Sequence, residues 1–189
     1  LARQAVESGV VECAIAVGFE QMTPGALKGA YDDRPSPMNH FLEIMSSLQG
    51  FETQTPRAAQ LFGGAARDYM KEFDIAPSTF RQISVKARQH AARNPLAVFK
   101  NILSLEEVMA SPMIFDPLTR YQCCPPTCGA AAAIICSEEF AKKHHLDQRV
   151  KIVAQAMTTD TTSTFDKKDM RQLVGYDMSA AAAEQAYHQ

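Results

Sequence analysis

The sequence predicts an α/β protein in which a helical segment interrupts the sheet. Two short, almost wholly apolar segments, residues 10–18 and 129–136, have the composition of buried strands. Between them the apolar residues recur at spacings of three and four, which is typical of amphipathic helices. With 189 residues, 46% of them hydrophobic and 21% charged, the chain can bury the core of one globular domain or a little more. Intrinsic disorder is therefore not expected.

The composition also excludes some classes of protein. A formal net charge of -2 gives no surplus of positive charge to neutralise a phosphate backbone, so a nucleic-acid partner is not expected. The longest uninterrupted apolar stretch, residues 130–136, falls far short of the ~20 residues that a membrane-spanning helix needs, so no transmembrane segment is expected. Five cysteines, an odd number in a chain of this size, favour a reducing compartment.

The first elements follow from the glycine and proline pattern. Residues 1–9 are typical of the last turns of a helix closed by Gly9, and the sequence has no initiator methionine, so we expect a part of a longer polypeptide. Residues 10–18 predict a strand buried on both faces of a parallel sheet. Residues 19–37 are rich in proline, glycine and aspartate, which predicts a loop.

Four helices are expected in the middle of the chain. The apolar spacing predicts one over residues 37–48 and a second that begins after Pro56, a proline suited to the first helical position. A third extends from Pro77 to Asn94, where Asn-Pro stops it. A fourth, short helix is expected over residues 105–109.

The C-terminal part predicts alternating strands and helices. Residues 129–136 are ambiguous because alanine favours helix, but their brevity and the following Ser137, a suitable N-cap, favour a strand and then a helix. A further strand is expected over 150–157 and a helix over 165–173. Ser179 is expected to cap an alanine-rich helix that is still running at the end of the sequence.

The cysteines at 123, 124 and 128 raise the question of a metal site or a reactive thiol. A structural zinc site needs four ligands, and His144 and His145 lie beyond a predicted strand and helix, so no metal site is expected. A catalytic thiol is somewhat more plausible, but no positive neighbour is evident that would lower its pKa. The favoured interpretation is a packed, inert turn.

Two glycines inside the helix that follows Pro56 need an explanation, because each costs about 1 kcal/mol relative to alanine in a helix interior. Gly63 and Gly64 would allow close approach either of a ligand or of a neighbouring helix, beside Leu61 and Phe62. The sequence favours neither alternative.

Other signals are weak or absent. Four basic residues between 86 and 93 could contact a phosphate, but a charged helix face is usually only solvated. The sequence contains no GxGxxG or GxxxxGK[ST] phosphate loop, no HExxH motif and no GxSxG motif. The four basic residues that could contact a phosphate are Lys86, Arg88, His90 and Arg93.

Several segments carry a combined pattern that is specific although each alone is weak: residues 1–9, 12–22, 58–64, 123–125, 129–134, 159–165 and 174–178. Together these segments closely resemble one protein family, the thiolase domain of sterol-carrier-protein-type 3-ketoacyl-CoA thiolases. The resemblance extends over essentially the whole chain.

The resemblance implies a thiolase fold, a five-layer αβαβα arrangement with a helical loop-domain insertion in its first half. On that basis residues 1–18 would be the end of the first half and residues 19–113 the loop domain. Residues 114–149 would complete the first half, and residues 150–189 would begin the second. Two strands without the rest of their sheet would leave apolar faces exposed to water.

The implied activity is that of a 3-ketoacyl-CoA thiolase (acetyl-CoA C-acyltransferase), which cleaves 3-ketoacyl-CoA with a second coenzyme A in fatty-acid or sterol side-chain β-oxidation. Coenzyme A is then a substrate and no further cofactor is expected. The family's catalytic motifs would lie before Leu1 and beyond Gln189, so no catalytic residue is expected in this chain. The loop domain covers the pantetheine and acyl chain, and Leu61, Phe62 and Gly63 match the segment that approaches them.

The resemblance further implies a homodimer or homotetramer, acyl-CoA and CoA as ligands, and a peroxisomal or mitochondrial location. A lipid or sterol ligand is also possible within this family. In the family an Asp-Gly pair usually precedes the alanine-rich strand, whereas this sequence has Cys128-Gly129. That departure, together with the missing nucleophile, motivates an alternative: a non-catalytic thiolase-like protein that binds acyl-CoA or lipid.

Overall fold

A computed structural model describes residues 1–23 and 33–189, which form two compact units. The first unit comprises the described parts of residues 1–28 and 125–155, together with Gln189. The second comprises the described parts of residues 29–124 and 156–188. The chain therefore passes from the first unit to the second, which it mostly forms, and then crosses between the two units three more times.

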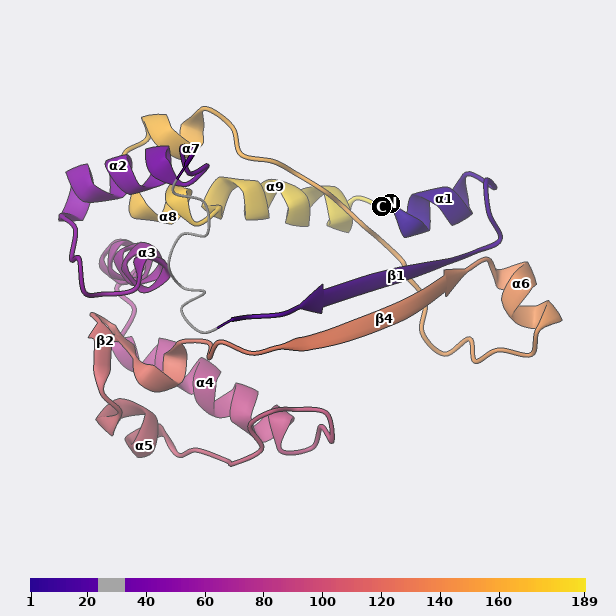
Figure 1. Cartoon of the computed structure of the whole chain (residues 1–189), viewed down its shortest axis with the longest axis horizontal. Coiled ribbons are helices and arrows are strands. Elements are labelled where there is room, and N and C mark those ends of the chain that lie inside the picture. The colour runs from indigo at the N-terminus through magenta and orange to yellow at the C-terminus, as the bar shows by residue number, and fades with distance from the viewer. Residues whose placement is uncertain (24–32) are drawn as a thin grey trace. The chain divides into compact units, whose positions relative to one another are not determined.

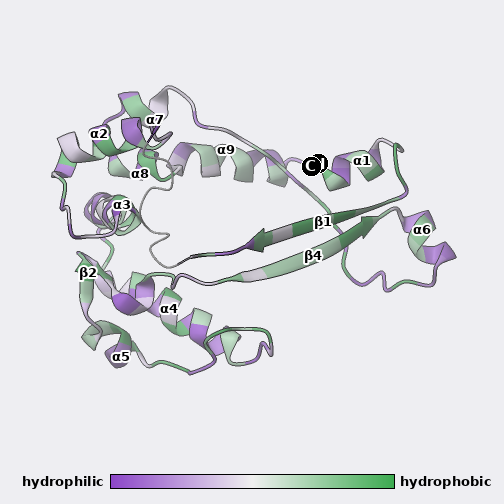
Figure 2. Ribbon diagram, viewed as in Figure 1, coloured by the Kyte–Doolittle hydropathy of each residue, from purple (hydrophilic) through white to green (hydrophobic). Residues whose placement is uncertain are grey.

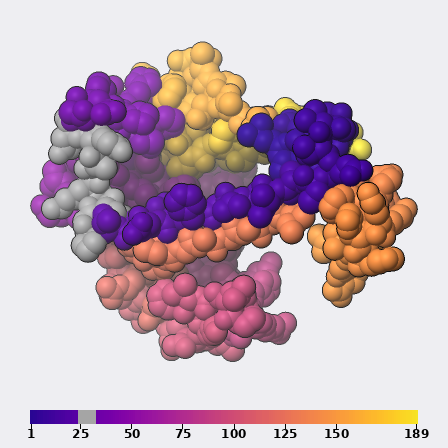
Figure 3. All heavy atoms as spheres, turned by 45° about the vertical axis from the view of Figure 1, so that its right-hand side comes forward, coloured from indigo at the N-terminus to yellow at the C-terminus, as the bar shows by residue number. Residues whose placement is uncertain are grey.

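The first unit is built on two antiparallel strands, β1 (Cys13–Glu20) and β4 (Gly129–Cys136). They lie side by side over their whole length, with Cys13 opposite Cys136 at one end (Figures 1 and 3). The expectation of parallel strands is wrong for this pair. The segment between the strands returns the chain in the opposite direction, so β4 meets β1 antiparallel, which a connection of any length permits.

Both strands are apolar along most of their length, as Figure 2 shows. The expectation that β1 is buried on both faces is wrong for this chain, because Ile15 is 64% exposed, Phe19 is 81% exposed and Ile134, opposite Ile15, is 68% exposed. Among the described residues this sheet has no strands other than these two, so neither strand has a second neighbour. The exposure of apolar faces is what the sequence predicted for two strands without their neighbours.

Short helices flank the sheet at the end where Cys13 pairs with Cys136 (Figure 1). Helix α1 (Ala2–Glu7) precedes β1 and ends beside Gly9, whose φ of 75° confirms the predicted glycine stop. Helix α6 (Glu138–Lys143) follows β4. Its predicted N-cap is confirmed, since the Ser137 hydroxyl accepts a hydrogen bond from the backbone N–H of Phe140 at 3.1 Å.

The second unit contains the four helices expected in the middle of the chain, with ends within a few residues of the prediction. A two-stranded ribbon and a single 3-10 turn, neither of which was predicted, follow the fourth helix. The elements are α2 (Asn39–Gln49), α3 (Arg57–Phe73), α4 (Pro77–Ala91), α5 (Leu105–Ala110), β2 (Met113–Phe115), β3 (Leu118–Thr119) and η1 (Arg120–Gln122).

The chain that follows α6 differs from the prediction, first in the last residues of the first unit and then in the rest of the second. Residues 150–157 form no strand, because no other described strand is available to pair with them. The helix expected over 165–173 is broken into two short helices, since Lys168 has a φ of 49° and Asp169 is the N-cap of a new helix. The last helix begins after Gly175 rather than at Ser179. These helices are α7 (Ser163–Asp166), α8 (Met170–Leu173) and α9 (Tyr176–Tyr187).

The core of the second unit joins segments that are more than a hundred residues apart in the sequence. Side chains from α2 and α3 pack against those from α8, and Phe41 and Phe165 extend the cluster through an edge-on ring contact at 5.0 Å. Burial of this apolar surface is the main favourable term that holds α8 on α3. The buried members are Met45, Leu61, Ala65, Met170 and Leu173.

Part of the loop expected over 19–37, residues 24–32, lies outside the described residues, and residues 19–20 belong to β1. Within the described ranges, no helix is both long enough and apolar enough to cross a membrane.

Candidate functional site

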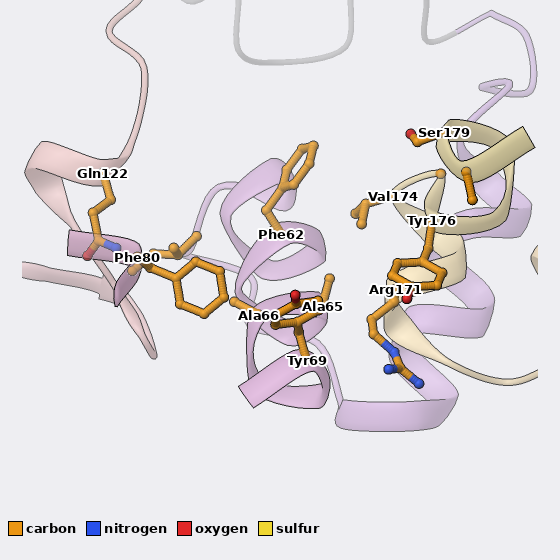
Figure 4. Close-up of a pocket in the computed structure, with 13 residues that line it drawn as sticks. Phe62, Ala65, Ala66, Tyr69, Phe80, Gln122, Arg171, Val174, Tyr176 and Ser179 are labelled. Atoms are coloured by element: carbon orange, nitrogen blue, oxygen red, sulfur yellow. The ribbon is translucent and has the colours of Figure 1, made fainter. Parts of the chain in front are cut away.

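A groove of about 700 Å³ crosses the surface of the second unit. It lies between one face of α3, the start of α4 with the β3–η1 segment, and the turn from α8 into α9 (Figure 4). This volume lies within the usual range for small-molecule sites. The lining residues are Phe62, Ala65, Ala66, Tyr69, Phe80, Leu118, Gln122, Arg171, Val174, Gly175, Tyr176, Ser179 and Ala180.

Helix α3 supplies the floor of the groove. Ala65 and Ala66 lie three and four residues after Phe62, and Tyr69 lies four and three residues after them, so the four side chains share one helix face. The two alanines leave open space between the larger rings of Phe62 and Tyr69 (Figure 4). Phe62 is 58% exposed, which is a large apolar exposure for a residue that lines a concave surface.

The α8–α9 turn supplies one wall. Gly175 has a φ of 85°, a left-handed conformation that side chains rarely adopt, and this glycine turns the chain sharply into α9. As a result Val174 and Tyr176, on either side of the turn, both line the groove (Figure 4). The wall is thus apolar with a phenolic hydroxyl at one position.

Arg171 is the only cationic side chain among the described residues that line the groove. Its guanidinium is held by Asp169, with Nη2 2.6 Å from Oδ2 and Nε 3.0 Å from Oδ1. This hydrogen-bonded pairing lowers the pKa of Asp169 and raises that of Arg171. The guanidinium also lies 5.5 Å from the Tyr176 ring centroid, a cation–π distance. The charge is therefore fixed in place and largely neutralised.

The three residues predicted to approach a substrate occupy different environments. Leu61 is 6% exposed and belongs to the core. A Cβ built on Gly63 would lie 2.6 Å from Cδ1 of Phe115, so this glycine is required by packing within the protein. Phe62 alone of the three lines the groove. Gly64 likewise packs against protein atoms, from Gln49 on α2 and Met170 on α8. Approach of a neighbouring helix is therefore favoured at Gly64, whereas the neighbour at Gly63 is strand β2.

Gln60, which the sequence pattern did not single out, holds the chain that leads into α3. Its side chain is fully buried, and its Nε2 donates to the backbone oxygens of Glu52 and Thr55, both at 2.8 Å. Its Oε1 accepts from the N–H of Glu52 at 3.0 Å. Gln60 thereby holds the connection between α2 and α3 next to Leu61. The only sequence signal is a polar residue beside the apolar stripe of α3, which ordinarily indicates a solvent-facing position.

The cysteine turn has no arrangement suited to chemistry. Burial, followed by the neighbouring Cys124, raises the pKa of the Cys123 thiol, which lowers its thiolate fraction. Cys128 is exposed, and its Sγ accepts a hydrogen bond from the N–H of Met22 at 3.3 Å. In residues 1–23 and 33–189 no three His, Cys, Asp or Glu side chains gather where they could hold a metal ion.

The basic face of α4 is partly engaged with aromatic rings. The Arg88 guanidinium lies 4.9 Å from the centroid of Phe99 and 5.8 Å from that of Tyr121. These cation–π contacts give Arg88 a structural role. Lys86 and Arg93 remain exposed, as expected for a solvated helix face.

Comparisons with known proteins agree with this architecture. The chain is 42% identical over 188 residues to sterol carrier protein 2 of Gallus gallus, a match that covers 99% of the chain and 34% of that protein. It is 30% identical over 192 residues to the benzoylsuccinyl-CoA thiolase subunit BbsB of Thauera aromatica, which covers the whole chain and 45% of the subunit. The chain thus spans about a third to a half of the length of these relatives. No protein-family model matches it.

A solved structure, described as an Ltp2-ChsH2(DUF35) aldolase, superimposes with a TM-score of 0.63 and 25% identity. The likeness covers 86% of the chain and 39% of that structure. The mixed α/β architecture is accordingly part of a thiolase fold. The chain belongs to the family of sterol carrier protein 2 and the thiolase-like proteins.

Proposed function

We propose that the groove over α3 binds the acyl and pantetheine portion of an acyl-CoA, and that the complete protein containing this chain cleaves 3-ketoacyl-CoA by thiolysis. The observation that carries the proposal is the exposed Phe62 ring, which lines an apolar groove in the segment that resembles the thiolase loop domain. The two alanines beside it leave room for a narrow, flexible chain.

The chemistry of the groove supports binding rather than catalysis. Apolar side chains dominate its lining, and a site of this kind gains affinity from the burial of acyl or pantetheine carbons. Gln122, Ser179 and Tyr176 offer polar atoms that could orient amide groups of pantetheine. Arg171 is already paired with Asp169, so it contributes little net charge toward a phosphate.

In the proposed reaction a cysteine thiolate supplied by another part of the protein attacks the keto carbon of 3-ketoacyl-CoA. Acetyl-CoA leaves, and the thiol of a second coenzyme A takes the acyl group, so that the products are acetyl-CoA and an acyl-CoA two carbons shorter. This chain would hold the substrate while those steps occur. A homodimer or homotetramer and a peroxisomal or mitochondrial location accompany this proposal on the basis of the family.

The test uses the complete protein with Phe62→Ala, and Ile83→Ala as the matched control. Ile83 is 61% exposed on α4 and does not line the groove. Loss of about 1.5–3 kcal/mol of apolar burial predicts that Phe62→Ala weakens binding of a non-hydrolysable acyl-CoA by roughly ten-fold or more, measured by calorimetry. Ile83→Ala should leave the affinity unchanged. Equal affinities for Phe62→Ala and the unmodified protein would contradict the binding site.

The alternative, a lipid- or acyl-CoA-binding protein without thiolase activity, is favoured by one observation, the replacement of the family's usual aspartate by Cys128. Thiolysis assays of the complete protein separate the two functions. Formation of acetyl-CoA from 3-ketoacyl-CoA and CoA supports the thiolase. Saturable acyl-CoA binding that depends on Phe62, without any acetyl-CoA formed, supports the alternative.

A further inference from the structure

Two of the five cysteines face each other across the sheet of the first unit. Cys13 begins β1 and Cys136 ends β4, and the two are direct partners in the antiparallel register. Because side chains at directly opposed positions lie on the same face of a sheet, both thiols project from the same face. Figure 1 shows this end of the sheet, where α1 leads into β1 and β4 leads into α6.

The hydrogen bonds define the kind of pair. The N–H of Ser137 donates to the carbonyl oxygen of Glu12 at 2.9 Å, so residues 12 and 137 form a hydrogen-bonded pair. In an antiparallel ladder the next pair along is then non-hydrogen-bonded, and its Cα atoms lie about 4.5 Å apart. Cys13 and Cys136 occupy that position. The spacing lies within the Cα separations that disulfides adopt, from about 4.4 to 6.8 Å.

The other three cysteines lack this arrangement. Cys123 and Cys124 are adjacent in sequence on an irregular segment, and Cys128 is hydrogen-bonded to the backbone of Met22. Cys13 and Cys136 are both half-buried and form no disulfide in the structure, and no cluster of metal-binding side chains surrounds them within the described ranges. They combine partial access to solvent with a backbone that already brings their β-carbons together.

We infer that Cys13 and Cys136 form a reversible cross-strand disulfide, made by exchange with a small disulfide such as oxidised glutathione. One protein thiolate attacks a sulfur of oxidised glutathione, which forms a mixed disulfide and releases one glutathione as its thiol. The second thiolate then attacks the protein sulfur of that mixed disulfide and releases the other glutathione. Two protein thiols are oxidised, one glutathione disulfide is reduced, and both protons end on glutathione.

The disulfide would join Cys13, which precedes the main part of the second unit in the sequence, to Cys136, which follows it. It would close a loop that contains residues 14–135 and tie the ends of β1 and β4 together. Cross-links that close long loops stabilise chiefly by restricting the unfolded chain. The sheet would therefore resist separation more strongly in an oxidising environment than in a reducing one.

The experiment exposes the complete protein to oxidised and reduced glutathione at several ratios, blocks free thiols, and maps the tryptic peptides. Residues 4–28 contain Cys13 alone, whereas residues 121–142 contain the other four cysteines, so fragment ions must assign the partner. We expect the two peptides to be linked through Cys136, with reversal by dithiothreitol. We also expect Tm to rise by about 5 °C on oxidation.

Two variants complete the test. Cys136→Ser should abolish the link between the two peptides and the rise in Tm, whereas Cys128→Ser, which removes an exposed cysteine, should leave both unchanged. The inference is wrong if the unmodified protein gives no linked peptide, if the fragment ions join Cys13 to another cysteine, or if Cys13 carries only glutathione. These readings on the unmodified protein do not depend on whether a variant folds.

Discussion

The backbone of Gly63 on α3 lies against the ring of Phe115, close enough that a methyl group on Gly63 would come within 2.6 Å of Phe115 Cδ1. The backbone oxygens of Phe115 and Asp116 are also near, at 3.3 and 3.2 Å from that position. The glycine therefore fixes how closely α3 approaches β2. Since Phe62 precedes Gly63, the same contact sets the position of the ring that lines the groove.

Gly63→Ala should destabilise the protein. Overpacking of this kind costs about 1–3 kcal/mol, and the better helix propensity of alanine offsets about 1 kcal/mol of it, so we expect a net loss of up to about 2 kcal/mol. Chemical denaturation measures the change in the free energy of unfolding. Gly18→Ala is the control, because a Cβ there meets no atom within 4 Å and should cost little. An unchanged stability for Gly63→Ala would show that the contact is not tight.

Gln60→Leu should lower the free energy of unfolding more than the same substitution at an exposed glutamine. The leucine cannot replace three hydrogen bonds to the backbone of Glu52 and Thr55, and the buried groups left unpaired predict a loss of about 3 kcal/mol. Gln54→Leu provides the control, since Gln54 is exposed and the same substitution there should change stability by less than about 0.5 kcal/mol. Thermal unfolding of the two variants measures the difference. Similar Tm values would contradict a stabilising role for the hydrogen bonds of Gln60.

The Asp169–Arg171 pair predicts a pH dependence of stability. Hydrogen bonding to Arg171 lowers the pKa of Asp169 in the folded state below its unfolded value. The stabilisation is therefore fully present above the ordinary aspartate pKa of about 4 and is lost as the pH falls through the lower, folded pKa. Asp169→Asn keeps an N-cap residue for α8 but removes the charge.

We expect the unmodified protein to exceed Asp169→Asn in stability by about 1 kcal/mol at pH 7, and this advantage to shrink as the pH falls below the ordinary aspartate pKa of about 4. Urea denaturation at a series of pH values measures both curves. Other carboxylates titrate equally in the two proteins, so the difference isolates Asp169. A difference that stays constant between pH 7 and pH 3 would show that the pair contributes nothing through its charge.

Cys128 takes over part of the role that a carboxylate would have at this turn. Its sulfur accepts the N–H of Met22 at 3.3 Å, a weak hydrogen bond on an exposed side chain. Cys128→Ala should lower stability by less than about 1 kcal/mol, and Cys128→Asp should restore at least the original stability at pH 7 through a charge-assisted bond. Calorimetric Tm values check both, and an aspartate variant less stable than the alanine variant would contradict this account.

The family, the helical segment between the two long strands and most helix ends were readable from the sequence. Local signals sufficed for these features: Gly9 stops α1, Ser137 caps α6, and the apolar spacing identifies α2 and α3. Each depends on backbone conformations and side-chain periods within a few residues, which a single sequence displays directly. The combination of segments that resembles thiolases was equally readable from the sequence.

The way in which distant segments combine is visible only in the folded chain. The antiparallel pairing of β1 with β4, the packing of α8 on α3 and the burial of Gln60 all join residues whose partners lie elsewhere in the chain. The strand expected over 150–157 did not form, because a strand needs a neighbour to pair with and local β propensity supplies none. Leu61, Phe62 and Gly63 form one continuous motif in the sequence. They separate into a core residue, a groove residue and a packing contact because successive residues of a helix point in different directions.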